Sequence, residues 1–529
     1  MSWPMILKAS LRFAWSLMVL TLPSALAGQN TGSAAPAAAH APAPNEDEKA
    51  SHKGSQLEIT VSEAVLLALE NNRELRVERL NPPIRRTYEE QERAVFDPVV
   101  STELTRTRAA TASGADRDHS VTEQTSTDLS LSKKFSPGTK FALGAGAQHT
   151  NTSPAADPLN RTRLGLTVTQ PLLRGRGSEA NLALLRQARL DTLASEYELR
   201  GFAESLVARV ESTYWDYALA WRQIQIYSES LRLAEQQLSE TQERIRIGKL
   251  AGTELAAAEA EVARRREDLI NAHSNLAATR LRLLRLVNPP VADLWNLDLA
   301  LRDQPVVPNP LDAGLEDVAA HVARALRLRP DLNQARLNLQ RGDLEVVRTR
   351  NGLLPKMDLF LTLGKSGYAD SFGGTWRDLD SSNYDIGAGV TFEWPLGNRD
   401  ARARHRRATL SRRQLEEAVE NLAQLVEVDV RSAYIEVQRA REQVAATAAT
   451  RRLQDESLRA ETEKFRVGKS TTFLVAQAQR DQVASQIAEV AAVVTYLKTL
   501  VDLYRLEGSL LQRRGVVVLP TAAEPTARE

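Results

Sequence analysis

The stretch KFRVGKSTTF, residues 464–473, contains Gly-Lys-Ser-Thr, the last residues of a phosphate-binding loop. Such a loop also needs a preceding strand and a glycine five positions before the second glycine. Here that position is Glu463, and the residues before it repeat apolar side chains every seven positions, as coiled-coil helices do. An earlier copy, RIRIGK at 244–249, is followed by leucine and lacks the hydroxyl that would hold magnesium. Both phrases are therefore interpreted as turns between antiparallel coiled-coil helices, with Gly248 and Gly468 as C-caps.

The two phrases belong to a unit of roughly 230 residues that occurs twice, and a long internal repeat sets the architecture. The offset between Gly248 and Gly468 also pairs Tyr214 with Tyr434 and Leu286 with Leu506. Each copy has the same order: short helices, an alternating segment, a very long helix, the Gly-Lys phrase and another long helix. The first copy carries about 33 extra residues in its alternating segment, judged by the change in repeat offset.

The helix before each Gly-Lys phrase is unusually long. In the first copy, two rows of residues spaced seven apart run from Leu206 to Ile245. A helix over about 178–246 would be roughly 100 Å long at ~1.5 Å per residue, which no compact globule needs. In the second copy the row is interrupted at Arg451. Because that seam is broken, we expect the second hairpin to move more than the first.

The segments between the prolines have a different period. RLGLTVTQ at 163–170 and DIGAGVTFEW at 385–394 alternate apolar residues with small or polar ones. Strands of about ten residues with this alternation are typical of outer-membrane barrels, but a soluble sheet with one buried face has the same period. Aromatic residues stand near the segment ends, and we interpret them as a membrane girdle: Phe96, Phe135, Tyr368, Trp376, Tyr384 and Trp394.

Closure of such a sheet requires more than one chain. The two copies supply four to six strands, whereas a barrel in lipid needs at least about eight and leaves no open edge. The sequence therefore predicts an obligate oligomer. The extra residues of the first copy predict two additional strands, which we interpret as a protruding or lengthened hairpin rather than as added barrel wall.

Composition excludes several classes of function. The chain has no cysteine, a net charge of +1, and seven histidines that form no metal-binding motif. No catalytic, cofactor-binding or metal-binding residue is predicted, and no nucleic-acid partner is indicated. The N-terminus reads as an export signal, with a positive flank, an apolar core over 13–22 and the cleavage sequence Ala25-Leu26-Ala27.

Taken in order, these features resemble the TolC-like outer membrane efflux proteins. The resemblance rests on ITVSEAVLLALENNREL at 59–75, QPLLRG at 170–175 and FRVGKSTTFLVAQAQ at 465–479. It implies a mainly α-helical chain with a membrane β-barrel portion, in which three chains share one barrel continuous with a periplasmic tunnel. It also implies no catalysis. The implied partners are a periplasmic adaptor, outer membrane lipid and an inner-membrane transporter of RND, ABC or MFS type.

The resemblance also assigns roles to the hairpin tips. Adaptor contact and gating fall on Gly248, Lys249, Thr253, Glu254, Phe465, Gly468, Lys469, Ser470, Leu474 and Gln477. The family often has two aspartates where this chain has Leu474 and Gln477, so an acidic ring at the entrance is not predicted. Glu254 could supply one carboxylate per chain, or simply stabilise a helix N-terminus.

A second candidate site is basic. The stretch RDARARHRRATLSRR at 399–413 and the matching place in the first copy suggest a collar just below the barrel, made of Arg174, Arg176, Arg402 and Arg406. These residues could contact lipid phosphates, line the lumen and favour anions, or form a solvated helix face.

The chain is divided into a signal peptide (1–27), a disordered leader (28–56), a first repeat (57–290), a linker (291–314), a second repeat (315–510) and a disordered tail (511–529). Strands are expected within about 98–171 and 355–395, and long helices at about 178–247, 253–287, 399–467 and 472–507. The function expected from the resemblance is an outer membrane exit duct for a tripartite efflux pump or a type I secretion system, extending into the periplasm. The alternatives are a soluble periplasmic coiled-coil adaptor or scaffold and, weakened by Glu463, a P-loop enzyme.

Overall fold

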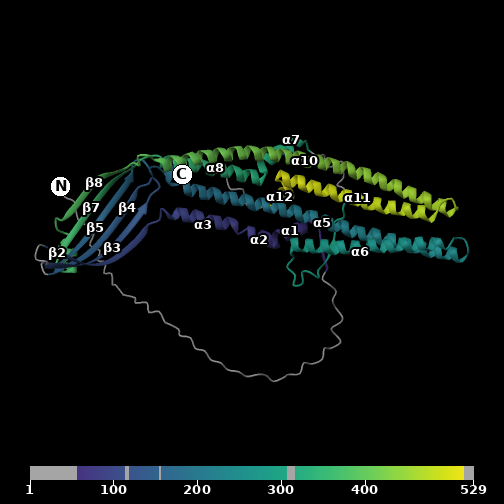
Figure 1. Ribbon diagram of the computed structural model, residues 1–529, viewed down its shortest axis with the longest axis horizontal. Coiled ribbons are helices and arrows are strands. Elements are labelled where there is room, and N and C mark those ends of the chain that lie inside the picture. Colours follow the sequence, from purple (N-terminus) through teal and green to yellow (C-terminus); the bar gives the residue numbers. More distant parts are fainter. Residues whose placement is uncertain (1–55, 114–117, 154–155, 307–315, 517–529) are drawn as a thin grey trace, which may run out of the picture. The chain divides into compact units, whose positions relative to one another are not determined.

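The computed structural model describes residues 56–113, 118–153, 156–306 and 316–516 (Figure 1). The predicted signal peptide lies outside the described residues, as does the predicted leader except for Gln56. None of the described helices is both long and apolar enough to cross a membrane.

Two long antiparallel helical hairpins dominate the described chain. The first joins α5 (Ala183–Arg246) to α6 (Thr253–Val287), and the second joins α10 (Arg399–Arg466) to α11 (Thr472–Glu507) (Figure 1). A short helix, α4 (Ser178–Asn181), precedes α5, so the helix expected from residue 178 is divided at Leu182. The mainly helical fold with a tandem repeat agrees with the prediction.

Shorter helices flank the hairpins. They are α1 (Val61–Asn71), α2 (Arg73–Glu78), α3 (Asn81–Ala94), α7 (Val318–Leu328), α8 (Pro330–Gly352), α9 (Phe372–Asp378) and α12 (Leu510–Arg513). The start of α1 is fixed by a capping box, in which Glu63 N donates to Thr60 Oγ1 at 3.2 Å and Thr60 N donates to Glu63 Oε2 at 2.8 Å. A proline pair opens α3, where a missing N–H has no cost.

A parallel strand pair closes the first repeat. β1 (Gln56–Ile59) pairs with β6 (Asp298–Leu301), and two buried tyrosines of α5 hold the pair. Tyr214 donates to the Ile59 carbonyl at 3.0 Å, and Tyr217 donates to the Leu299 carbonyl at 2.9 Å. The segment expected as a plain linker therefore contains a strand, because its partner lies 242 residues away and no local pattern marks it.

The last described residues also differ from the prediction of a disordered tail from residue 511. Leu511 of α12 is 2 % exposed, and Arg514 forms an ion pair with the buried Glu211 of α5 at 2.5 Å. Helix and ion pair attach this segment to α5. The remainder of the predicted tail, residues 517–529, lies outside the described residues.

Six antiparallel strands form the second sheet: β2 (Val99–Ser113), β3 (Asp118–Lys134), β4 (Lys140–Ser153), β5 (Ala156–Pro171), β7 (Lys356–Ala369) and β8 (Tyr384–Glu393). Their order is β2-β3-β4-β5-β7-β8 (Figure 1), so the two repeats meet where β5 pairs with β7. The extra residues of the first repeat account for two more strands than the second repeat has, since the first supplies β2 to β5 and the second only β7 and β8. Within one chain the β2–β3 hairpin continues the sheet, since β3 pairs with β4 from Val121↔Ser153 to Lys134↔Lys140. Whether this hairpin protrudes from a closed barrel stays a prediction.

Helix α9 rests on β5 and β7 near the end of the sheet farther from the hairpins. The hydroxyls of Thr162 and Thr375 lie 2.6 Å apart, and both side chains are buried. The close approach requires a glycine on β7, because a Cβ at Gly367 would lie 2.0 Å from the Thr375 carbonyl oxygen.

One buried carboxyl in α5 makes stability depend on pH. Glu204 is 2 % exposed, and burial raises its pKa to about 7, because the attractions of Arg200 and Arg505 offset only part of the desolvation. A raised acid pKa means that the folded state holds a proton that the unfolded state has lost. Stability therefore falls as pH rises from the ordinary pKa of 4.5 towards about 7.

We predict that Glu204→Gln will be more stable than the wild type at pH 8 and nearly equal to it at pH 4.5. The expected difference at pH 8 is up to about 3 kcal/mol, at about 1.4 kcal/mol per pKa unit. The measurement is the thermal midpoint of the detergent-purified protein across this pH range. The control is Glu229→Gln, an exposed acid of the same helix whose pKa is lowered by its bond to Arg232 and which does not titrate in this window. A stability difference between Glu204→Gln and wild type that does not change with pH would contradict the prediction.

Candidate functional site

One face of the six-stranded sheet is apolar and exposed. A single row of paired residues crosses every strand, and it reads Val100, Leu131, Leu143, Leu166, Leu363 and Ile386. Several of these side chains are open to the surroundings: Val100 is 68 % exposed, Leu363 49 % and Ile386 71 %. A continuous apolar surface of this extent marks an interaction site or a membrane contact.

The opposite face is small and polar. The adjacent row of pairs reads Ser101, Ser130, Gly144, Gly165, Gly364 and Asp385. Arg163 reaches across this face to Asp385, with Nη2 2.6 Å from Oδ2. The sheet therefore has one face suited to hydrocarbon and one suited to water, which is the alternation that the sequence predicted.

The aromatic residues predicted to form a girdle lie at both ends of the strands and on both faces of the sheet. Tyr384 and Trp376 are exposed at the end of the apolar region that lies farther from the hairpins. Phe135 packs edge-on against Phe141 near the other end, at a ring distance of 5.4 Å. Tyr368 departs from the predicted girdle, because it lies on the polar face, where the Arg161 guanidinium stands 5.5 Å from its ring. The alternation within β7 decides this placement, because Tyr368 is an odd number of residues from Leu363 on the apolar face.

The two Gly-Lys phrases form matching hairpin tips. Gly248 and Gly468 have φ values of 75° and 74°, a conformation that favours glycine. In each tip the lysine N–H donates to the carbonyl five residues earlier, at 2.8 Å, and the glycine N–H donates to the carbonyl three residues earlier. These are Schellman C-caps, so the N–H groups of the glycine and the lysine in each tip are engaged by the helix itself.

Polar contacts join one tip to the other. The Arg244 guanidinium lies 5.0 Å from the ring centre of Phe465. Farther along the helices, Glu261 of α6 accepts from Arg480 of α11 at 3.1 Å and lies 2.6 Å from the buried Arg265 of its own helix. Glu261 thus links the two hairpins close behind their tips, with a side-chain exposure of only 11 %.

The other tip residues expected at the gate are placed as follows. Lys249, Thr253, Lys469, Leu474 and Gln477 are exposed, and Glu254 is half-buried in the first turn of α6. Ser470 donates to Glu461 at 2.8 Å within its own hairpin. The structure brings Phe465 to the first hairpin, where its ring lies beside Arg244.

Sequence reasoning missed the contacts that join the hairpins. Ala258, Arg265, Ala272 and Thr279 lie seven apart and are all buried, so an arginine interrupts a row of small residues. That interruption is the signal that a buried ion pair follows. The corresponding break at Arg451, which the sequence did reveal, is bridged by Glu489 of the facing helix at 2.6 Å.

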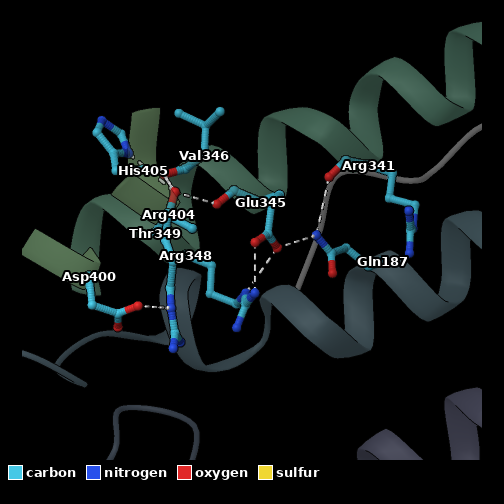
Figure 2. Close-up of polar contacts among 9 residues, drawn as sticks. All are labelled: Gln187, Arg341, Glu345, Val346, Arg348, Thr349, Asp400, Arg404 and His405. Carbon is cyan, nitrogen blue, oxygen red and sulfur yellow. Dashed lines mark hydrogen bonds and ion pairs between the residues drawn. The ribbon is translucent and has the colours of Figure 1, made fainter. Parts of the chain in front are cut away.

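A polar cavity of about 630 Å³ lies between α5, α8 and α10, near the start of α10 (Figure 2). Five arginines line it, together with Glu345 and Asp400: Arg341, Arg348, Arg404, Arg407 and Arg412. Figure 2 shows Glu345 between Gln187 and Arg348, with Gln187 Nε2 donating at 3.3 Å and Arg348 Nη2 at 2.7 Å. Arg404 donates to Asp400 at 3.0 Å.

The arginines predicted to form a collar are not the arginines that line this cavity. Arg402 and Arg406 are exposed and do not line this cavity, and Arg176 is likewise exposed. Arg174 is half-buried, with Nη2 3.9 Å from Glu393. A helix repeats every 3.6 residues, so Arg404 and Arg407 face α8 while Arg402 and Arg406 point elsewhere. Which arginines of α10 line the cavity is therefore decided by the position of α8, which packs against one side of α10.

Among the described residues, no group of His, Asp or Glu is arranged to hold a metal ion.

Comparison with known families identifies two matching segments. Residues 65–288 and 322–509, more than half of the chain, match the family described as outer membrane efflux protein. The two segments fall within the two predicted repeats. No curated protein is similar enough to be counted as a relative.

Solved structures share the fold at low sequence identity. The outer-membrane channel OprN is 18 % identical, with a TM-score of 0.65 over 85 % of this chain and 89 % of that one. The CmeC outer membrane channel of Campylobacter jejuni is 15 % identical, with a TM-score of 0.64 over 85 % and 86 %. The MtrE outer membrane channel of Neisseria gonorrhoeae, solved in its open state, is 20 % identical, with a TM-score of 0.59 over 85 % and 89 %.

Proposed function

The chain belongs to the outer membrane efflux protein family, and we propose that it is the passive exit duct of a tripartite efflux pump or a type I secretion system. The protein is located in the outer membrane and extends into the periplasm. One observation carries the proposal: an apolar row crosses all six strands and is exposed on five of them, while the other face of the sheet is polar. Such a sheet separates hydrocarbon from water.

Assembly follows from the same sheet. In hydrocarbon every backbone N–H and C=O needs a partner, so an open six-stranded sheet cannot stand alone in lipid. Sister chains supply the missing partners, and the family resemblance favours three copies. The strands would then share one barrel, and the long hairpins would continue it as a tunnel.

Conduction and gating are assigned to the hairpins. Substrate enters between the tips, passes through the tunnel and leaves through the barrel. Opening separates the hairpins, which breaks the contacts of Glu261 with Arg480 and of Arg244 with Phe465. A coiled-coil seam has discrete registers, so such a movement is a sliding or uncoiling between defined states.

The partners follow from the same assignment. The exposed residues of the tips, among them Lys249 and Lys469, contact a periplasmic adaptor that connects the duct to an energised inner-membrane transporter. The exposed arginines Arg402 and Arg406 stand within one or two turns of the start of α10, where they contact lipid phosphates of the inner leaflet.

The experiment that tests the function is membrane fractionation followed by recording in planar bilayers. We expect the mature protein to stay in the outer membrane after high salt and alkaline washes, to need detergent for extraction, and to give discrete conductance steps. A soluble adaptor or scaffold would wash off and conduct nothing. That result would contradict the proposed function, because the apolar face would then lie in water.

A further inference from the structure

The sheet of one chain ends in two unpaired edges, β2 and β8. We propose that every chain contributes all six strands to the shared wall, with β8 of one copy pairing with β2 of the next. Three copies then close a barrel of eighteen strands. This inference rests on the proposed function and specifies its oligomeric interface, whose partner is a second copy of this chain.

The first argument is that the β2–β3 hairpin is built as membrane wall. Leu131 of β3 and Val100 of β2 continue the apolar row that begins on β8, and Leu104 of β2 is 74 % exposed on the same face. A hairpin projecting into water would need no exposed apolar face in register with its neighbours. The polar row continues as well, with Ser101 and Ser130 bonded through their hydroxyls at 2.7 Å.

The second argument concerns where the wall has to end. Above the apolar region, β2 carries Arg106 and Arg108, which lie 3.4 Å from Glu123 of β3. The hairpin therefore changes from apolar to charged along its length, as a strand does when it leaves hydrocarbon for water. A segment that merely decorated the barrel would not need this change.

The third argument is direction. β2 follows α3 and runs away from the helices, whereas β8 returns the chain to α10. All strands between them alternate, because every pair in the sheet is antiparallel. The β8 edge of one copy and the β2 edge of the next are therefore antiparallel as well, and the ring closes with an even number of strands.

The second repeat shows how much wider the proposed barrel would be than one built from two repeats with two strands each. It supplies only β7 and β8, so two repeats of that kind would give four strands per chain and twelve in three copies. Barrel diameter grows roughly linearly with strand number, so eighteen strands widen the barrel about 1.5-fold. Gly144 and Gly165 of the polar row leave space open on that face, whereas the Asp385 carboxylate covers Gly364. Size selection then falls on the hairpin tips and not on the barrel.

The decisive measurement is the strand count of the barrel in an electron cryomicroscopy map of the purified, detergent-solubilised oligomer. Eighteen strands are expected. A trimeric channel with twelve strands, and with the β2–β3 hairpin outside the wall, would overturn the inference and leave the exit-duct function standing. A protein that forms neither oligomer nor conductance would overturn the function itself, so the two failures are distinct.

Cysteine pairing gives an independent test, because the natural chain has none. Ser101→Cys or Thr105→Cys on β2, combined with Asp385→Cys or Thr391→Cys on β8, is expected to give covalent dimers and trimers on oxidation. The matched set replaces the β2 cysteine by Ala142→Cys or Gln148→Cys on β4. Chains of this set are expected to form no covalent cross-link on oxidation. Oligomers from the β4 set and none from the β2 set would place β4 at the edge and contradict the eighteen-stranded ring.

A deletion tests the opposite case, in which β4 instead of β2 forms the edge of the sheet. Removing residues 99–134 takes out β2 and β3 and leaves β4 as the edge strand. In that background the β4 and β8 cysteines are expected to cross-link, and the barrel is expected to have twelve strands. The full-length strand count decides the inference even if the deleted chain does not fold.

Discussion

Leu363→Arg is expected to keep most of the protein out of the outer membrane, whereas Thr362→Arg is expected to leave its assembly nearly unchanged. Leu363 lies in the middle of the apolar face of β7, paired with Leu166 on one side and Ile386 on the other. An arginine at mid-bilayer on the lipid side of a barrel costs about 2–4 kcal/mol. Because each chain of the proposed trimer would carry the change, the expected loss of assembled oligomer is at least a hundredfold.

Thr362 is a close control for this variant. It is the preceding residue of the same strand and pairs with Thr167 and Gly387, so it points to the polar face. The measurement is the amount of folded oligomer in washed outer membranes, compared by gel mobility without and with heating. If the two variants assembled equally well, the assignment of the apolar face to lipid would be wrong. If only Thr362→Arg failed, the two faces would be reversed.

Bridging the tips is expected to abolish transport. Lys249 and Lys469 occupy equivalent positions in the two Schellman caps, and both side chains are exposed. In the variant that carries Lys249→Cys and Lys469→Cys, a short bis-maleimide would join neighbouring tips and hold the entrance closed. We expect efflux or secretion to fall to the level of a strain that lacks the protein, while the oligomer still forms. The readout is transport by cells with and without the reagent.

A maleimide with a single reactive group provides the matched control, since it modifies the same cysteines without joining them. Transport should survive that treatment. Unimpaired transport after complete cross-linking would show that the tips do not gate the duct. Equal loss with both reagents would show that bulk at the tip, and not a bridge, is responsible.

Local pattern carried much of the fold. Heptad rows and the glycines at 248 and 468 mark the hairpins and their turns, because helix periodicity and a left-handed cap are properties of neighbouring residues. The alternation marks the strands for the same reason. The β1–β6 pair and the attachment of Arg514 to Glu211 escaped prediction, since each joins residues more than two hundred positions apart.

The candidate sites also include some features that local sequence marks and others that depend on contacts between distant residues. The tip glycines lie where the sequence placed them, but Glu261 and Arg480 acquire a role only when α6 and α11 meet. Likewise, Arg404 and Arg407 line a cavity because α8 presents Arg341 and Arg348 to it, and no spacing within residues 399–413 distinguishes them from Arg402. Contacts between helices distant in sequence are therefore the part that a single sequence leaves open.

The strand pair that closes the first repeat implies an order of events as the chain acquires its fold. The α5–α6 turn involves only a few residues, whereas joining β1 to β6 encloses about 240 residues and carries a larger entropy of loop closure. The helical hairpin should consequently form early and the strand pair late. Tyr214, whose hydroxyl binds the Ile59 carbonyl, stands edge-on to Trp215 at 5.4 Å, so indole fluorescence would report that last step.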